Sequence, residues 1–330
     1  PSAWSINILL FRMKNLLFEN GDKMPTLGLG TWKSKPNEVY KAVLHAIQVG
    51  YRHIDCAYVY KNENEIGQAI SDAIAKGMVK REDLWITSKL WNDAHLPQDV
   101  LPAIQNTLKD LQLDYLDLYL VHWPVALKKG VGLPTDPSDF LTKDQAPLAD
   151  TWAEMEKLHK KGLTRQIGVS NFNSAKIEAL KANASIMPTV NQVEYHPYLP
   201  QEKLKEYCDN NGIYITGYGP LGAAYRVADN EVDHPILLEN TVLQEIAAKH
   251  SATVAQVVLA WAIEKGVSVV PKSVNFKRIE ENFAAANLSL DNEAIKIISN
   301  LGGPYRYTHG SAWVGEISPY DFSDIWEECL

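Results

Sequence analysis

The chain has 330 residues, of which 46% are hydrophobic and 22% charged, and its formal net charge is −8. This length and hydrophobic share suffice for one large buried core, and α/β barrels of this size commonly form a single domain. The interspersed acidic surplus disfavours a nucleic-acid partner, which needs a basic face. No apolar run of 18 residues occurs, so we expect no membrane-spanning helix.

Three scattered cysteines, Cys56, Cys208 and Cys329, indicate a reducing, cytoplasmic location without a disulfide framework. They contain no C-x-x-C pair. We therefore expect no bound metal and no zinc-dependent alcohol dehydrogenase chemistry.

Residues 1–12 read as an appended or upstream-translated extension. They precede Met13, and MKNLLFENGDKMP reads like a natural start. The apolar run is too short, and its flanks are wrong, for a signal peptide. We expect residues 13–330 to form one folded domain, and mass spectrometry of natively produced protein would test this boundary.

After a hairpin-like start at residues 20–22, short apolar runs alternate with amphipathic helical patterns. Eight runs are predicted as strands: 27–32, 51–55, 84–89, 115–122, 165–171, 189–192, 213–218 and 267–272. Helical patterns follow them at 37–50, 63–77, 96–113, 151–162, 174–184, 199–212, 253–266 and 275–286. This alternation predicts a (β/α)8 TIM barrel with an N-terminal β-hairpin and an extended C-terminal tail. Long irregular segments follow the fourth strand (124–148) and the seventh (219–238).

A doubly wound sheet with a glycine-rich dinucleotide turn is the alternative architecture. GLG at 28–30 begins such a turn, but Lys33 stands where the third glycine belongs. A literal G-x-G-x-x-G match at 217–222 is interrupted by Pro220, and we expect no helix in 223–235. Phosphate binding by this motif needs a helix N-terminus, so we interpret the match as a coincidence.

Polar side chains lie at the carboxyl ends of the predicted strands, where barrel enzymes carry their reactive groups. They are Asp55, Lys89, His122, Ser170, Asn171, Gln192, Tyr218 and Lys272. His53 lies inside the second run and reads as a core histidine. Any one of these residues could be structural, but packing does not explain their convergence at one end of successive strands.

Asp55, Lys89 and His122 fit the reduction of a carbonyl group if a tyrosine supplies the proton. A lysine ammonium lowers the pKa of a nearby phenol from about 10. A carboxylate keeps the lysine charged and in place, and a histidine can hydrogen-bond the substrate oxygen. Tyr58 and Tyr60 both follow Asp55, and these considerations do not choose between them.

The segment DCAYVYKNENEIG at 55–67 resembles the signature of the aldo-keto reductase family. Further matching motifs are GLGTW, ITSKLW, LVHWP, IGVSNF, NQVEYHP, GYGPLG and PKSVNFKRIEEN, in order over residues 14–300. The resemblance, to aldose and aldehyde reductases, implies a catalytic tetrad of Asp55, Tyr60, Lys89 and His122. Tyr60 is then the proton donor, and Tyr58 is a loop or pocket residue. The implied activity is NADPH-dependent reduction of aldehydes and ketones, including aldoses and aromatic and aliphatic aldehydes.

The resemblance also implies that NADPH or NADP+ lies across the barrel mouth without a Rossmann unit. Lys272 and Arg278 suit a 2′-phosphate, because cations at a helix N-terminus otherwise oppose its dipole. The implied cofactor contacts are Gly30, Thr31, Trp32, Asp55, Ser170, Asn171, Gln192, Tyr218, Leu221, Lys272, Ser273, Val274, Asn275, Arg278, Glu281 and Asn282. Many relatives carry serines where Gly219 and Ala223 stand, so this loop is expected to hold the cofactor less firmly.

The expected substrate pocket comprises Trp32, Tyr60, Trp91, His122 and Trp123. The aromatic tail from residue 302 is longer than the family pattern, and the resemblance assigns it no residues. We expect a monomer acting on a small carbonyl compound. A short-chain dehydrogenase is rejected, because no tyrosine has a lysine four residues later. A non-catalytic NADPH-binding barrel, serving as a channel subunit or structural protein, is the alternative function.

Overall fold

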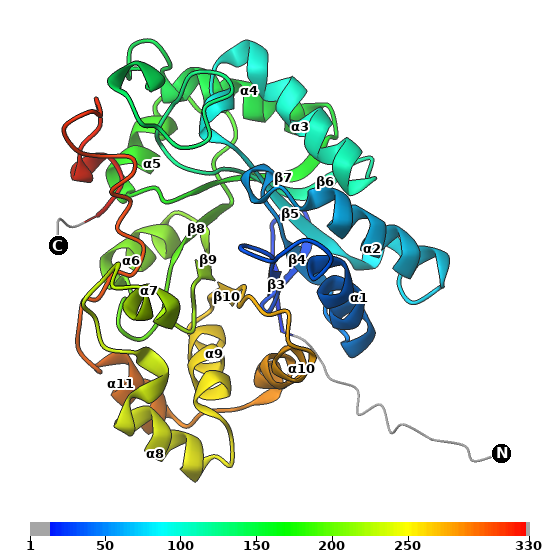
Figure 1. Ribbon diagram of the computed structural model, residues 1–330, viewed down its shortest axis with the longest axis vertical. Coiled ribbons are helices and arrows are strands. Elements are labelled where there is room, and N and C mark those ends of the chain that lie inside the picture. The colour runs from blue at the N-terminus through cyan, green and yellow to red at the C-terminus, as the bar shows by residue number, and fades with distance from the viewer. Residues whose placement is uncertain (1–13, 328–330) are drawn as a thin grey trace.

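The computed structural model describes residues 14–327 (Figure 1), so the predicted extension over residues 1–12 and Cys329 lie outside the described residues. Eight parallel strands form one sheet in which each strand pairs with its neighbour in the chain. They are β3 (Leu29–Gly30), β4 (His53–Asp55), β5 (Trp85–Leu90), β6 (Leu116–Val121), β7 (Thr164–Ser170), β8 (Val190–Glu194), β9 (Tyr214–Tyr218) and β10 (Ser268–Val269).

The sheet closes on itself where the first and last strands meet. Leu27 pairs with Val269 and Gly30 with Lys272, both in parallel. The Gly28 N–H donates to the Val269 carbonyl at 2.9 Å. A Cβ on Gly30 would lie 2.6 Å from the Val270 carbonyl oxygen, so glycine permits this close approach. The predicted (β/α)8 barrel is confirmed.

The predicted N-terminal hairpin is also present. Strands β1 (Asn15–Leu17) and β2 (Lys23–Pro25) pair in antiparallel register. Leu16, Phe18 and Met24 pack against buried side chains of β5, β6 and β8. The hairpin therefore adds its own small hydrophobic cluster to the barrel.

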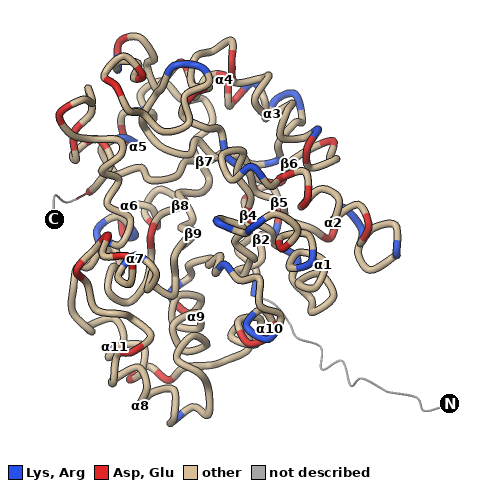
Figure 2. Tube along the Cα trace, in the orientation of Figure 1, with Lys and Arg blue, Asp and Glu red and all other residues tan. Residues whose placement is uncertain are grey.

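Helices surround the strands, and acidic and basic residues are interspersed along them (Figures 1 and 2). The eight predicted helices are α1 (Val39–Val49), α2 (Glu63–Ala75), α3 (Pro97–Leu111), α4 (Leu148–Lys160), α5 (Ser174–Lys181), α6 (Glu202–Asn210), α9 (Val254–Glu264) and α10 (Phe276–Ala284). α1 ends at Gly50, whose φ of 123° few other residues adopt. None of the described helices could span a membrane by itself. Only α9 joined with the preceding helix, residues 241–249, reaches the required length and hydropathy, and the two are bent by 85°.

Three further helices were not predicted: α7 (Ala224–Ala228), α8 (Thr241–Lys249) and α11 (Asn292–Ser299). The expectation of no helix in 223–235 was therefore wrong, because α7 forms there. α7 has five residues and none of them is buried, so tertiary packing supports it little. The last strand is much shorter than the predicted 267–272 and stops at Val269, two residues before Pro271.

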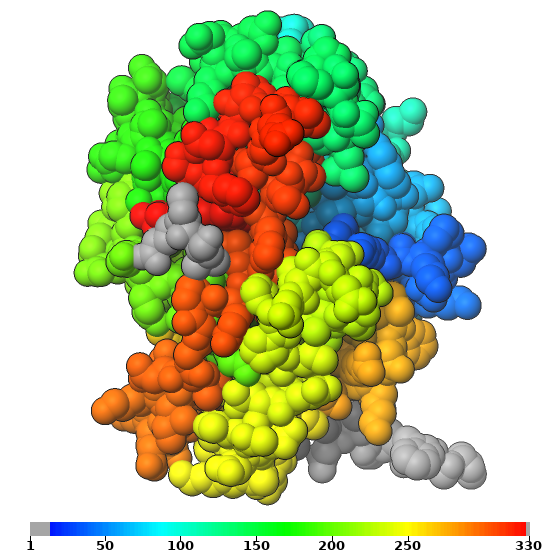
Figure 3. Space-filling view, turned by 60° about the vertical axis from the view of Figure 1, so that its left-hand side comes forward, coloured from blue at the N-terminus to red at the C-terminus, as the bar shows by residue number. Residues whose placement is uncertain are grey.

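The C-terminal tail, from residue 302, runs across the outside of the barrel near the long loop after β6 (Figures 1 and 3). The Tyr320 hydroxyl donates to the Leu141 carbonyl at 2.9 Å and accepts from the Ala126 N–H at 3.1 Å. Together with Trp91 and Trp123, the tail residues Trp313 and Trp326 form a second hydrophobic cluster. The tail is thus packed onto the barrel.

Candidate active site

Asp55 and Lys89 form a buried ion pair at the carboxyl end of the barrel. The Lys89 Nζ donates to Asp55 Oδ2 at 2.8 Å and to the Cys56 carbonyl at 2.7 Å. Gln192 on β8 donates its amide to the other Asp55 oxygen at 2.7 Å. Lys89 is 1% exposed and Asp55 is 3% exposed, so the pair is shielded from water. Neighbouring strands thereby fix both charges in one geometry.

The lysine keeps its charge in this environment. Burial lowers the pKa of Lys89, but Asp55 and Tyr60 raise it by more, so the net pKa lies above its usual range. A buried ammonium is stable here because a carboxylate and a carbonyl oxygen bind it directly.

Tyr60 lies above this pair, in a 3₁₀ turn over Tyr58–Tyr60 that follows β4. The Lys89 Nζ is 5.2 Å from the centroid of the Tyr60 ring. Burial raises the pKa of Tyr60 to about 12, and Lys89 works in the opposite direction. The lysine therefore acts on the phenol as the sequence predicted, but burial outweighs it. The phenol is protonated at neutral pH, as a proton donor must be.

His122 follows β6 and faces the same space. Its ring centroid is 6.1 Å from that of Tyr60 and 5.0 Å from that of Trp91. Burial, reinforced by Lys89 and His95, holds the pKa of His122 well below its usual range. Its Nδ1 is buried without a hydrogen-bond partner. The neutral ring thus carries one N–H that can donate to a substrate oxygen.

Ser170, Asn171, Gln192 and Tyr218 form a polar cluster on the adjoining strand ends. The Asn171 amide donates to the His122 carbonyl at 3.0 Å, and its oxygen accepts from the Tyr218 hydroxyl at 2.8 Å. The Ser170 hydroxyl donates to the Gln192 carbonyl at 2.8 Å. Asn171 has a φ of 61°, a left-handed conformation that asparagine tolerates. The structure therefore places these four residues beside the tetrad.

Lys272 and Arg278 lie near the N-terminus of α10. Asn275 caps this helix by accepting from the Arg278 N–H at 3.0 Å, and the Ser273 hydroxyl accepts from the Asn275 N–H at 3.1 Å. Neither cation forms an ion pair with another described residue. Burial lowers the pKa of Lys272, Glu38 opposes this, and Lys35 lowers it further. Two unpaired cations at a helix N-terminus fit the phosphate group that the sequence predicted.

The remaining predicted cofactor residues make different kinds of contact. Val274 and Asn275 line a cavity of about 360 Å³ against the start of α1. The Thr31 hydroxyl donates to the Asp55 carbonyl at 2.8 Å, and Leu221 packs partly buried against the core. Glu281 accepts from the Thr253 hydroxyl at 3.0 Å.

Two of the three predicted pocket tryptophans lie together. Trp91 and Trp123 contact the tail residue Trp313, with ring centroids 5.5 and 5.6 Å apart. Trp32 is separate from this aromatic cluster. It is 39% exposed and meets Tyr225 of α7 at 6.1 Å. The site therefore has two aromatic sides: Trp91 and Trp123 form one, and Trp32 with Tyr225 forms the other.

Sequence reasoning missed the residues that complete these two sides. Trp313 and Trp326 come from the tail, where the motifs end. Lys33 lies 4.9 Å from the Trp32 ring centroid and 4.5 Å from that of Tyr225, so it joins the barrel mouth to the loop after β9. The only available signal was the density of aromatic residues in these irregular segments.

Comparisons with known proteins agree with this geometry. The profile of the Aldo/keto reductase family matches residues 26–302. An aldo/keto reductase of Synechocystis is 47% identical over 96% of this chain and 97% of its own length. Aldo-keto reductase family 1 member A1 of Gallus gallus is 46% identical over 87% of this chain and 88% of its own. The solved aldose reductase of Schistosoma japonicum superposes with a TM-score of 0.82 at 46% identity, covering 89% of this chain and 94% of that one.

Proposed function

The chain belongs to the aldo/keto reductase family and is an NADP-dependent oxidoreductase. We propose that it reduces aldehydes and ketones with Tyr60 as the proton donor. The observation that carries the proposal is the stacked arrangement of Asp55, Lys89 and Tyr60. It sets one protonated phenol over a buried, charged lysine.

Each residue of the tetrad has a distinct task. Tyr60 gives its proton to the carbonyl oxygen of the substrate, and Lys89 stabilises the phenolate that remains. Asp55 holds Lys89 charged and in position. The neutral His122 donates a hydrogen bond to the same substrate oxygen and so orients it.

NADPH, when bound, supplies the hydride that the carbonyl carbon receives. Ser170, Asn171 and Gln192 would hold its carboxamide, and Tyr218 would face the nicotinamide ring. Lys272 and Arg278 would hold a 2′-phosphate, with Ser273 and Asn275 beside them. Since these two cations have no described ion-pair partner, we propose a preference for NADPH over NADH.

Small aldehydes, including aldoses and aromatic aldehydes, are the proposed substrates. Trp91, Trp123 and Trp313 offer an apolar wall beside His122, which suits an aromatic or aliphatic substrate. A panel of such aldehydes, with NADPH absorbance as the readout, ranks them. We propose that the enzyme acts as a monomer, which sedimentation of the active protein checks.

Replacing Tyr60 with phenylalanine tests the proton donor. We expect turnover to fall by about 10² to 10⁴ fold, because a general acid contributes that much, while NADPH affinity stays unchanged. Tyr58→Phe is the matched control and should keep nearly full activity. Equal activity of Tyr60→Phe and wild type would refute the assignment. If wild-type protein bound NADPH but reduced no carbonyl compound, a non-catalytic barrel would be supported instead.

The phosphate site has its own test. Arg278→Ala should weaken NADPH binding by about tenfold or more and leave NADH binding nearly unchanged, because the lost contact is with the phosphate alone. Lys277→Ala, an exposed neighbour, serves as the control. Equal affinities of wild type for NADPH and NADH would overturn this part of the proposal.

A further inference from the structure

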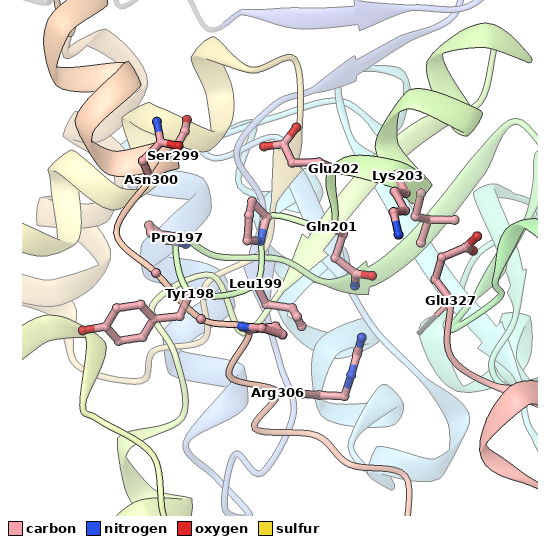
Figure 4. A pocket seen from close by; sticks show the side chains of 15 residues that line it. Pro197, Tyr198, Leu199, Gln201, Glu202, Lys203, Ser299, Asn300, Arg306 and Glu327 are labelled. Atoms are coloured by element: carbon pink, nitrogen blue, oxygen red, sulfur yellow. The ribbon is translucent and has the colours of Figure 1, made fainter. Parts of the chain in front are cut away.

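A second cavity, of about 440 Å³, lies outside the tetrad between the loop after β8 and the C-terminal tail (Figure 4). One wall is the segment from Pro197 to Leu204, which leads into the first turn of α6. The other runs from Ser299 to Arg306, at the end of α11 and the start of the tail. None of the site residues assigned above lines this cavity.

Arg306 is the unusual member of this lining. It is only 4% exposed, and its Nε and Nη1 atoms are buried without a hydrogen-bond partner. It forms no ion pair within 4 Å among the described residues, although Glu194 lies near enough to raise its pKa against the lowering effect of burial. Its guanidinium stacks on Trp326 at 4.0 Å. A buried cation without a bound acceptor is costly, so an anion placed there gains a strong interaction.

The wall opposite Arg306 also favours an anion. α6 has nine residues and begins after Gln201, whose side chain does not cap it. Gln201 instead donates to the Glu194 carbonyl at 2.7 Å. Gln201 to Leu204, at the start of α6, line the same cavity as Arg306, so the positive end of the helix dipole favours an anion there. Figure 4 shows Arg306 directed from the tail towards Gln201.

Two carboxylates also line the cavity, but both have partners. Glu202 pairs with Lys265 at 2.6 Å, and Glu327 accepts from the Ser174 N–H at 2.6 Å and the Ser174 hydroxyl at 2.5 Å. Much of the remaining lining is apolar, formed by Pro197, Leu199, Pro200, Leu204 and Pro304. A fully hydrated inorganic anion gains nothing from such walls, whereas an organic anion buries its hydrocarbon part on them.

We propose that this cavity is a binding site for a small organic monocarboxylate with an apolar body. Its carboxylate is received by the guanidinium of Arg306, at the positive end of the α6 dipole. A planar guanidinium matches a carboxylate in a two-bond geometry. The apolar body lies against the proline and leucine walls.

Binding of benzoate to the protein without nucleotide tests the proposal, measured by ligand-observed NMR and calorimetry. We expect a dissociation constant of about 1 mM, since a small ligand with few heavy atoms gains limited affinity. Benzyl alcohol, the neutral analogue, should bind at least tenfold more weakly. Inorganic phosphate should also bind more weakly, and phosphate binding as tightly as benzoate would overturn the assignment of an apolar body.

Three variants locate the binding. Arg306→Gln should weaken benzoate binding more than tenfold, and Arg306→Lys, which keeps the charge and loses the planar fork, should weaken it less. Because Arg306→Gln could destabilise the tail, Glu202→Gln is included. Its side chain is 58% exposed, and removing this acid should tighten benzoate binding about threefold. An unchanged affinity in Glu202→Gln, or in a folded Arg306→Gln, would refute the site. The same measurements on Tyr60→Phe separate this site from the tetrad, because that variant should bind benzoate as wild type does.

Discussion

Replacing Asp55 with asparagine removes the carboxylate from a pair in which both partners are almost completely buried. Lys89 keeps its bond to the Cys56 carbonyl but loses the charge that compensates its own. Breaking a buried ion pair by removing one partner costs about 3 to 5 kcal/mol, and the retained carbonyl places this case near 3 kcal/mol. Unfolding entropy of about 2.1 cal/mol/K per residue converts this, for 330 residues, into a Tm lowered by about 4 °C.

The loss should depend on pH in a definite direction. Without Asp55, burial governs Lys89, and its folded-state pKa falls below the unfolded value. The folded chain then binds fewer protons than the unfolded chain between the two pKa values, so raising the pH restores stability to the variant. In wild type the folded-state pKa is raised, and the pair stabilises the fold fully below the unfolded pKa.

Thermal unfolding followed by circular dichroism at pH 7 and pH 9.5 measures both effects. Asp209→Asn is the matched control, because Asp209 meets Lys205 at 2.6 Å but is 59% exposed. Exposed pairs contribute about 0 to 1 kcal/mol, so its Tm should change by about 1.5 °C or less. If Asp55→Asn unfolded at the same temperature as the control, the claim that burial makes this pair critical would be wrong.

Three other predictions concern the same region. Glu63 is buried, its pKa is raised to about 7 by burial, and Ser88 donates to it at 2.5 Å. Its folded form therefore holds a proton that the unfolded form has lost, so stability should fall by about 3 kcal/mol between pH 4.5 and 7. Melting curves of Glu63→Gln should lack this decline. The rate constant for carbonyl reduction should be level from about pH 6 to 9 and fall only at higher pH, because Tyr60 ionises with a pKa of about 12. Stopped-flow assays measure this profile, and a fall in the rate constant near pH 7 would contradict it. Gly67→Ala should destabilise the protein by about 2 kcal/mol, because the new Cβ would lie 2.4 Å from the Asp110 carbonyl oxygen; an unchanged urea midpoint would disprove that contact.

The barrel was predictable from the sequence because the apolar residues of its strands and helices follow regular patterns. Strands buried on both faces read as apolar runs, and helices such as α1 and α2 carried clear amphipathic patterns ending near Gly50 and Gly77. α8 and α11 were missed because they fall outside the strict strand and helix alternation, although they are as long as α6 and α5, which were predicted. Their stability comes from packing that a local pattern does not reveal.

Within the site, the placement of polar residues was predictable, but their energetics were not. Strand ends in a barrel converge, so Asp55, Lys89 and His122 had to lie near one another. The net pKa of Tyr60 depends on how deeply it is buried, which no motif specifies. Arg306 reads as an ordinary tail residue in sequence, and only the packed tail shows that its guanidinium lies buried in a cavity wall.

The brevity of β3 and β10 has a consequence for biosynthesis. Because β3 closes against residues near Val269, its outer edge has no partner until the chain has been synthesised past residue 272. An unpaired strand edge is where newly made chains stick together. Here that edge is only two residues long, and one of them is Gly30. The short strand therefore leaves little backbone for another chain to pair with before β10 has been synthesised.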